Sequence, residues 1–127
     1  MGKLNVAIIG VGNCASSLVQ GVQKYREAPV DSFIPGLMHP VLGDYHIGDI
    51  EVVAAFDVDR DKVGKDVAEA IFSGQNNTAQ FTEVPMTGVK VERGMTHDGI
   101  GKYLAGVVQK AEGPTADIVN ILKDRDV

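Results

Sequence analysis

The apolar positions along the chain change their period several times, and each change predicts a different element. Residues 4–9 form a short run rich in branched apolar side chains, which is typical of a buried strand. From Ala15 onward, apolar residues recur at Leu18, Val19 and Val22, the spacing of a helix with one face toward a core. Residues 51–58, EVVAAFDV, predict a second buried strand.

The second half of the chain repeats this change of period. Apolar residues at 63, 67, 70 and 71 predict a helix that starts at Asp59 or Asp61. Residues 88–94 alternate like a third, shorter strand, and a helix weakened by glycines is predicted from about Gly99. A last helix is predicted in PTADIVNILKD, with Thr115 as its cap and positions 118, 121 and 122 on one face.

Between the first helix and the second strand, the periodicity is lost. Residues 26–48 hold three prolines, three glycines and two histidines, which predicts a long loop or insertion. The remaining order is strand, helix, strand, helix, strand. That alternation predicts an α/β fold, a Rossmann-like parallel sheet with helices on both faces, in one domain over residues 1–127.

Composition removes several classes of function. The net charge is −5 without any cluster of Lys or Arg, so we expect no nucleic-acid partner. The sequence holds neither an apolar run of the ~20 residues that a membrane span needs nor the pattern of a secretion signal. The single cysteine, Cys14, excludes an internal disulfide and favours a cytoplasmic location.

The turn after the first strand carries the main candidate site. Gly10, Gly12 and Ala15 match the G-x-G-x-x-G/A dinucleotide fingerprint, in the strand-to-helix context that the motif requires. The first glycine permits the tight turn, the second leaves a pyrophosphate room beside the backbone, and the alanine lets helix and strand pack closely. The helix N-terminus offers amides to the phosphates, so Val11, Asn13 and Cys14 join the predicted cofactor loop. The alternative is a tight corner without a ligand.

Asp57 ends the second strand, where a carboxylate accepts the hydroxyls of an adenosine ribose. Its charge would repel the 2′-phosphate of NADP, so the predicted cofactor is NAD. Asp57 follows Gly10 by 47 residues, against the usual ~20, and the insertion at 26–48 accounts for the excess. Two alternatives stay open: Asp57 caps the following turn, or Asp59 takes the role.

Several longer stretches together resemble the prokaryotic branch of inositol-3-phosphate synthase, also called myo-inositol-1-phosphate synthase. They are VAIIGVGNCASSLVQGV, PGLMHPVLGDYHIGDIEVVAAFDVD, VGKD, AIF, NNT and RGMTHDGIGKY. The resemblance covers nearly the whole chain. It implies conversion of glucose 6-phosphate to myo-inositol phosphate by internal oxidation, enolisation, aldol cyclisation and reduction, with NAD as an internal redox partner, for inositol and phospholipid biosynthesis.

The resemblance also implies that the chain is the N-terminal portion of such an enzyme. The catalytic lysines, the substrate domain and one wall of the cofactor crevice are expected beyond Val127, so we expect the 127-residue chain alone to be inactive. The resemblance further implies a homo-oligomer, which is a tetramer in this family. It also implies that Asp66 belongs to the NAD site. Two other functions stay open: a non-catalytic NAD-binding module, and a different Rossmann-fold dehydrogenase.

The remaining candidates have competing interpretations. His39, His46 and Asp49 lack a metal-ligand spacing, so we predict surface or interface residues and no metal site. The resemblance places the stretch from His97 to Lys102 near the active site, although Asp98 could equally cap a helix and Lys102 could be solvated. Cys14 is predicted as a packing residue in preference to a reactive thiol. Asn76 and Asn77 either reach the adenine side or form a turn.

Overall fold

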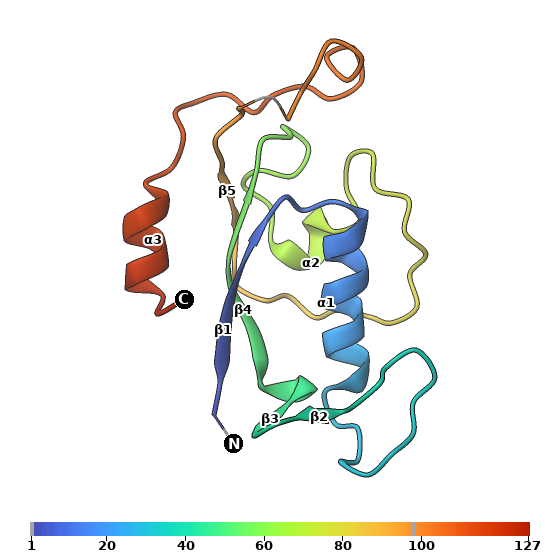
Figure 1. Cartoon of the computed structure of the whole chain (residues 1–127). Helices are drawn as coiled ribbons and strands as arrows, with labels where there is room; N and C mark the ends of the chain where they lie inside the picture. Colours follow the sequence, from blue (N-terminus) through green and yellow to red (C-terminus); the bar gives the residue numbers. More distant parts are fainter. Residues whose placement is uncertain (1, 98) are drawn as a thin grey trace.

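The computed structural model describes residues 2–97 and 99–127, and a parallel three-stranded sheet forms its centre (Figure 1). The strands are β1 (Leu4–Ile9), β4 (Ile50–Asp57) and β5 (Val91–Arg93). Their spatial order is β1-β4-β5, and β4 is paired on both sides. All three strands were predicted from the sequence, the third as a longer element.

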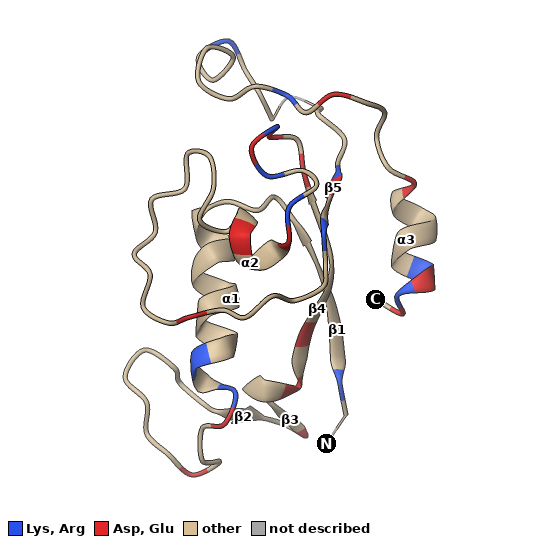
Figure 2. Cartoon of the chain, turned by 180° about the vertical axis from the view of Figure 1, so that it is seen from behind, with Lys and Arg blue, Asp and Glu red and all other residues tan. Residues whose placement is uncertain are grey.

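Helices lie on both faces of this sheet. Helix α1 (Asn13–Tyr25) and the short α2 (Val67–Ala70) cover one face, and α3 (Ile118–Asp124) lies on the other (Figures 1 and 2). The Arg125 side chain fixes the end of α3 to the sheet by donating to the Val53 carbonyl over 2.9 Å. The prediction of an α/β fold with a parallel sheet is therefore confirmed.

The core lies between the sheet and the α1–α2 layer. Branched apolar side chains of the strands meet the apolar stripe of α1, as their periods of two and 3.6 require. Ala15 belongs to this core at 8% exposure, so the small residue of the fingerprint does let α1 pack closely. The buried cluster consists of Ile8, Val11, Ala15, Val19, Ala55, Val67, Ala70, Ile71 and Val91.

The segment 26–48 follows α1 and lies outside the three-stranded sheet. It contains an antiparallel hairpin, β2 (Val41–Leu42) with β3 (Tyr45–His46), which leads into the 3₁₀ turn η1 (Ile47–Asp49). His46 is buried and caps that turn: its Nδ1 accepts from the Gly48 amide, and Nε2 contacts the Ala28 carbonyl. The Asp49 carboxylate accepts from the His46 amide. The prediction of surface or interface residues is therefore wrong for His46, which is buried, whereas His39 is exposed.

The predicted helix over residues 59–72 is wrong in its start and its length. Helix α2 has four residues, and its cap is Asp66, whose carboxylate accepts from the Ala68 amide over 2.8 Å. Asp59 instead accepts from the Asp61 amide within a turn, so neither of them starts a helix. Gly64 has a φ of 87°, a left-handed conformation that interrupts a right-handed helix before Asp66.

Two further helix predictions need correction. Residues 102–107 form turns instead of a helix, because glycines at 101 and 106 weaken it and its apolar side chains Tyr103, Leu104 and Val107 stay exposed. Asp98, considered above as its cap, lies outside the described residues. The last helix begins after Asp117, which accepts from the Asn120 amide, so Thr115 is not its cap.

Within the described part of the chain, no helix is long and apolar enough to cross a membrane.

Candidate functional site

The two glycines of the fingerprint have different backbone conformations. Gly10 has a φ of 92° and donates its amide to the Phe56 carbonyl over 2.8 Å, so the turn itself requires a glycine there. Gly12 has a φ of −94° and a ψ of −162°, which any residue adopts. A Cβ on Gly12 would meet no heavy atom within 4 Å. The fold therefore tolerates a side chain at Gly12, and the space beside it is open.

Helix α1 begins directly after Gly12, so its first-turn amides follow the glycine loop. Gly12 is the N-cap and supplies no side-chain cap, and the first turn contains no acidic residue. A helix N-terminus of this kind attracts anions through its amides and its dipole. Cys14 in this turn is exposed, so the prediction that it is a packing residue is wrong.

Asp57 lies beside the loop and is bonded to it. Its Oδ2 accepts from the Val11 amide over 2.7 Å, and its Oδ1 accepts from the amides of Val58 and Asp59 over 2.6 and 2.9 Å. The carboxylate thus caps the turn after β4, as one alternative predicted, and at the same time holds the glycine loop. Of its roughly four acceptor positions, three are taken by these amides.

Lys62 and Asn76 complete the contacts behind the loop. Lys62 is 6% exposed, and its Nζ lies 4.0 Å from the Asp57 Oδ2 and donates to the Asn76 Oδ1 over 3.0 Å. The Asn76 amide nitrogen donates to the carbonyls of Val11 and Ile71. Asn76 therefore forms more than a turn, because it fixes the carbonyl side of the glycine loop. Neither the pairing of Lys62 with Asp57 nor the hydrogen bond from Asn76 to Val11 was predicted.

The segment 76–81 is held along α1 by two polar side chains. The Asn13 Oδ1 accepts from the amides of Asn77 and Thr78, and its amide nitrogen donates to the Asn77 Oδ1 over 2.9 Å. The fully buried Gln20 accepts from the Phe81 amide and donates to the Ala79 carbonyl. The Asn13 side chain is thus engaged with this segment, and its backbone amide is the group placed at the helix start.

Asp66 is buried and fully engaged in structural contacts. Burial acts to raise the pKa of its carboxyl, but hydrogen bonds from the Ala68, Thr87 and Gly88 amides and the Thr87 hydroxyl outweigh it, so the pKa lies below its ordinary value. These bonds tie the start of α2 to the segment before β5. Its contact with NAD stays a prediction.

A cleft of about 330 Å³ opens at the carboxyl ends of the strands, next to Gly10 and Asp57. In parallel sheets this edge is where ligands bind. Apolar side chains dominate the lining, and Ile9 is 78% exposed into solvent. His97 lines the cleft with a φ of 41°, while Lys102 lies over the Tyr103 ring. The lining consists of Ile9, Gly10, Phe56, Asp57, Val58, Gly94, Met95, Thr96, His97, Gly99 and Ile118.

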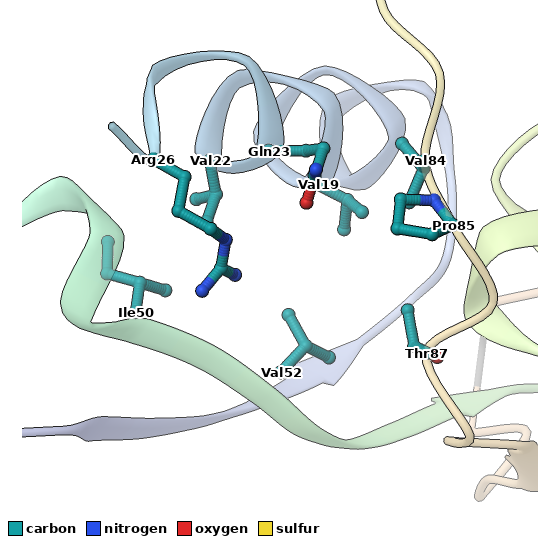
Figure 3. Close-up of a pocket in the computed structure, with 9 residues that line it drawn as sticks. All are labelled: Val19, Val22, Gln23, Arg26, Ile50, Val52, Val84, Pro85 and Thr87. Carbon is teal, nitrogen blue, oxygen red and sulfur yellow. The ribbon is translucent and has the colours of Figure 1, made fainter. Parts of the chain in front are cut away.

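A second pocket lies toward the amino end of β4 and serves as a contrast. Figure 3 shows the Arg26 side chain extending into the space between α1, Ile50 and Val52 of β4, and Pro85. This pocket measures about 100 Å³, and apolar side chains dominate its lining. It is far too small for a dinucleotide and lacks the glycine loop. The cleft at the carboxyl ends is the candidate site because Gly10 and Asp57 line it.

The described residues contain no cluster of His, Cys, Asp and Glu arranged to hold a metal ion. The structure brings Gly10, Val11, Gly12 and Asp57 together as the sequence predicted. It places Asp66 in a separate hydrogen-bonded group.

No family model matches the chain. The chain is 54% identical over 126 residues to an inositol-3-phosphate synthase of Mycolicibacterium smegmatis, which covers 99% of this chain and 35% of that protein. Among solved structures it matches Ari2 with a TM-score of 0.75 at 28% identity, over 100% of this chain and 36% of that one. A myo-inositol-1-phosphate synthase-related protein from Thermotoga maritima MSB8 has the same fold, with a TM-score of 0.62 at 22% identity over 98% of this chain and 32% of that one.

The chain thus spans about a third of the length of the proteins that it matches. The resemblance to inositol-3-phosphate synthase that the sequence predicted is confirmed.

Proposed function

We propose that this chain, which is homologous to about a third of inositol-3-phosphate synthase, forms the part of an NAD site that holds the pyrophosphate and the adenosine ribose. In the whole enzyme this site would serve the conversion of glucose 6-phosphate to myo-inositol phosphate. When bound, NAD supplies a hydride acceptor that returns the hydride within the same cycle. The residues of this site would hold the cofactor and would not themselves act on the sugar phosphate.

The observation that supports this proposal best is the glycine at position 12. Its backbone conformation does not require glycine, and no neighbouring atom would contact a Cβ there. A residue without a side chain is nevertheless placed at the uncapped start of α1. Close approach of a phosphate to the backbone explains this choice, because a side chain would occupy the space that the phosphate needs.

The parts of the ligand can be assigned to parts of the site. The first-turn amides of α1 would receive the pyrophosphate, in the manner of other helix N-termini. Asp57 would receive the ribose, because it is the acid at the end of the second sheet strand beside the glycine loop. The carboxylate has one acceptor position left after its three amide contacts. The sequence predicted that Asp57 accepts hydrogen bonds from both ribose hydroxyls. We now propose that it accepts from one of them.

Ribose recognition by Asp57 gives a measurable expectation. NAD should bind more tightly than NADP, because the 2′-phosphate would lie near the carboxylate. Of the 2′-deoxy and 3′-deoxy forms of the adenosine ribose, one should lose about tenfold in affinity and the other little, since one hydroxyl makes the charged hydrogen bond. Calorimetric titration of the four ligands at one ionic strength measures this.

Asp57→Asn serves as the matched variant, since it retains the shape of the side chain. It should reduce the preference for NAD over NADP and the difference between the deoxy forms. Equal or tighter binding of NADP to the unchanged chain would contradict the assignment of Asp57.

The chain studied as a 127-residue polypeptide should bind the adenosine half of the cofactor about as well as the whole. The proposed contacts, the loop amides and Asp57, all address the pyrophosphate and the adenosine ribose. ADP-ribose and NAD should therefore have affinities within about threefold of each other, and glucose 6-phosphate should not be turned over. Titrations of both ligands, beside an assay for inositol phosphate, decide this. Turnover, or NAD binding far tighter than ADP-ribose, would show that more of the site is present than we propose.

A further inference from the structure

We propose that Lys62 is a positioning residue of this site, which holds the glycine loop in place and balances the charge of Asp57, and so limits discrimination against NADP. The inference rests on the proposed function, because it concerns the same cofactor loop. Lys62 would not touch the ligand, since its side chain is 8% exposed and its ammonium group is directed to Asp57 and Asn76.

The contacts around Lys62 form a closed ring. The Asp57 carboxylate accepts from the Val11 amide, and the Asn76 side chain donates to the Val11 carbonyl. Lys62 joins these two side chains, by a hydrogen bond of 3.0 Å to the Asn76 Oδ1 and a distance of 4.0 Å to the Asp57 Oδ2. Both backbone polar groups of Val11 are thus held by side chains that share one buried cation.

This ring fixes the residue between the two fingerprint glycines. Val11 is fully buried, so its amide and carbonyl are shielded from water and depend on Asp57 and Asn76 as partners. Because Val11 precedes Gly12, its orientation sets the direction of the chain into the first turn of α1. A ligand that binds to the amides of this turn benefits from a loop that is held before binding.

The charge of Lys62 has a second consequence. Acidic and basic residues alternate in the turn after β4 (Figure 2). Among the basic residues of this turn, the buried Lys62 is the one that pairs with Asp57. Coulomb attraction is strong at this distance when both groups are shielded from water. A 2′-phosphate near Asp57 would therefore meet a carboxylate whose charge is partly compensated. Asp57 should therefore repel the 2′-phosphate of NADP less strongly with Lys62 beside it than it would without Lys62.

Lys62→Met tests both parts, because methionine keeps an unbranched stem and removes the charge. We expect the affinity for NAD to fall about tenfold and the affinity for NADP to fall about threefold further. Hydrogen exchange of the Val11 amide, followed by NMR without ligand, should become faster. Lys65→Met is the matched control: this exposed lysine of the same turn donates to the Ser73 hydroxyl and should leave all three readouts unchanged.

Asn76→Ala distinguishes the holding of the glycine loop from the compensation of the Asp57 charge. It also tests the first of these effects if Lys62→Met does not fold. It breaks the ring while the Lys62–Asp57 pair stays, so Val11 exchange should become faster with an unchanged ratio of NADP to NAD affinity. Unchanged Val11 exchange in both variants, or equal losses of NAD and NADP in Lys62→Met, would overturn the proposal. If the unchanged chain binds neither cofactor nor ADP-ribose, the proposed function is wrong, and so is the proposed effect of Lys62 on NADP binding. The exchange rate of the Val11 amide would still show whether Lys62 holds the glycine loop.

Discussion

Gly12→Val is expected to abolish measurable binding of NAD and ADP-ribose, a loss of at least about 100-fold, while the chain stays folded. The φ of −94° suits valine, and no heavy atom lies within 4 Å of the position of its Cβ, so the fold does not oppose the change. The two methyl groups would instead occupy the space where we place the pyrophosphate. Titration with both ligands measures the loss, and circular dichroism with urea unfolding checks the fold.

Two other glycines provide controls for this variant. Gly106→Val changes a residue that also has open space around it but lies away from the loop, so it should bind both ligands normally. Gly10→Ala should lower the free energy of unfolding, because the φ of 92° is unfavourable for a side chain. Normal ligand binding by a folded Gly12→Val chain would show that the turn is a strand-to-helix corner without a phosphate.

The parts of this fold that follow from local rules could be predicted from the sequence. The first strand, the glycine turn and the apolar face of α1 lie within 22 consecutive residues, and each follows from a short-range pattern. The spatial meeting of Asp57 with the loop was also predictable, because consecutive parallel strands end at one edge of the sheet.

Contacts between distant polar residues could not be predicted in this way. Asn76 follows Val11 by 65 residues, and no period or spacing signals their hydrogen bond. The burial of Lys62 was not predicted either, because the pattern around it indicated a helix that starts at Asp59 or Asp61. Gly64 interrupts that pattern with its left-handed conformation, and Lys62 lies buried beside Asp57 in the turn before it. Glycine permits a left-handed conformation but does not require it, so the sequence alone does not predict this turn.

The helix predicted from Gly99 failed for a related reason. Helices of this length gain most of their stability from burying an apolar face. The side chains of Tyr103 and Val107 are 83% and 53% exposed, so they gain no such burial in this chain. Periodicity indicates which residues would share a face, but it does not show whether a surface exists to receive them.

Asp66→Ala is expected to destabilise the chain by about 3 kcal/mol or more. The buried carboxylate accepts from three backbone amides and one hydroxyl, which connect α2 to the segment before β5. Removing it leaves these donors without their acceptor, and buried donors without partners are costly. The free energy of unfolding in urea measures the loss. A loss below about 1 kcal/mol would indicate that these donors find water or other partners easily.

The same carboxylate should make stability depend on pH in a defined direction. Its pKa in the folded chain lies below the ordinary value, because its hydrogen bonds outweigh the effect of burial. Its contribution is therefore fully present above the unfolded pKa of about 3.9 and is lost as the pH falls through the lower folded pKa. Asp66→Asn should be less stable than the unchanged chain at pH 7, and the difference should shrink below pH about 4. Glu51→Gln is the control: the exposed Lys3 lowers the pKa of Glu51 too, but screening by water makes that pair weak, so its profile should hardly change. A difference between Asp66→Asn and the unchanged chain that stays constant from pH 7 to pH 2 would show that the charge of Asp66 does not stabilise the fold.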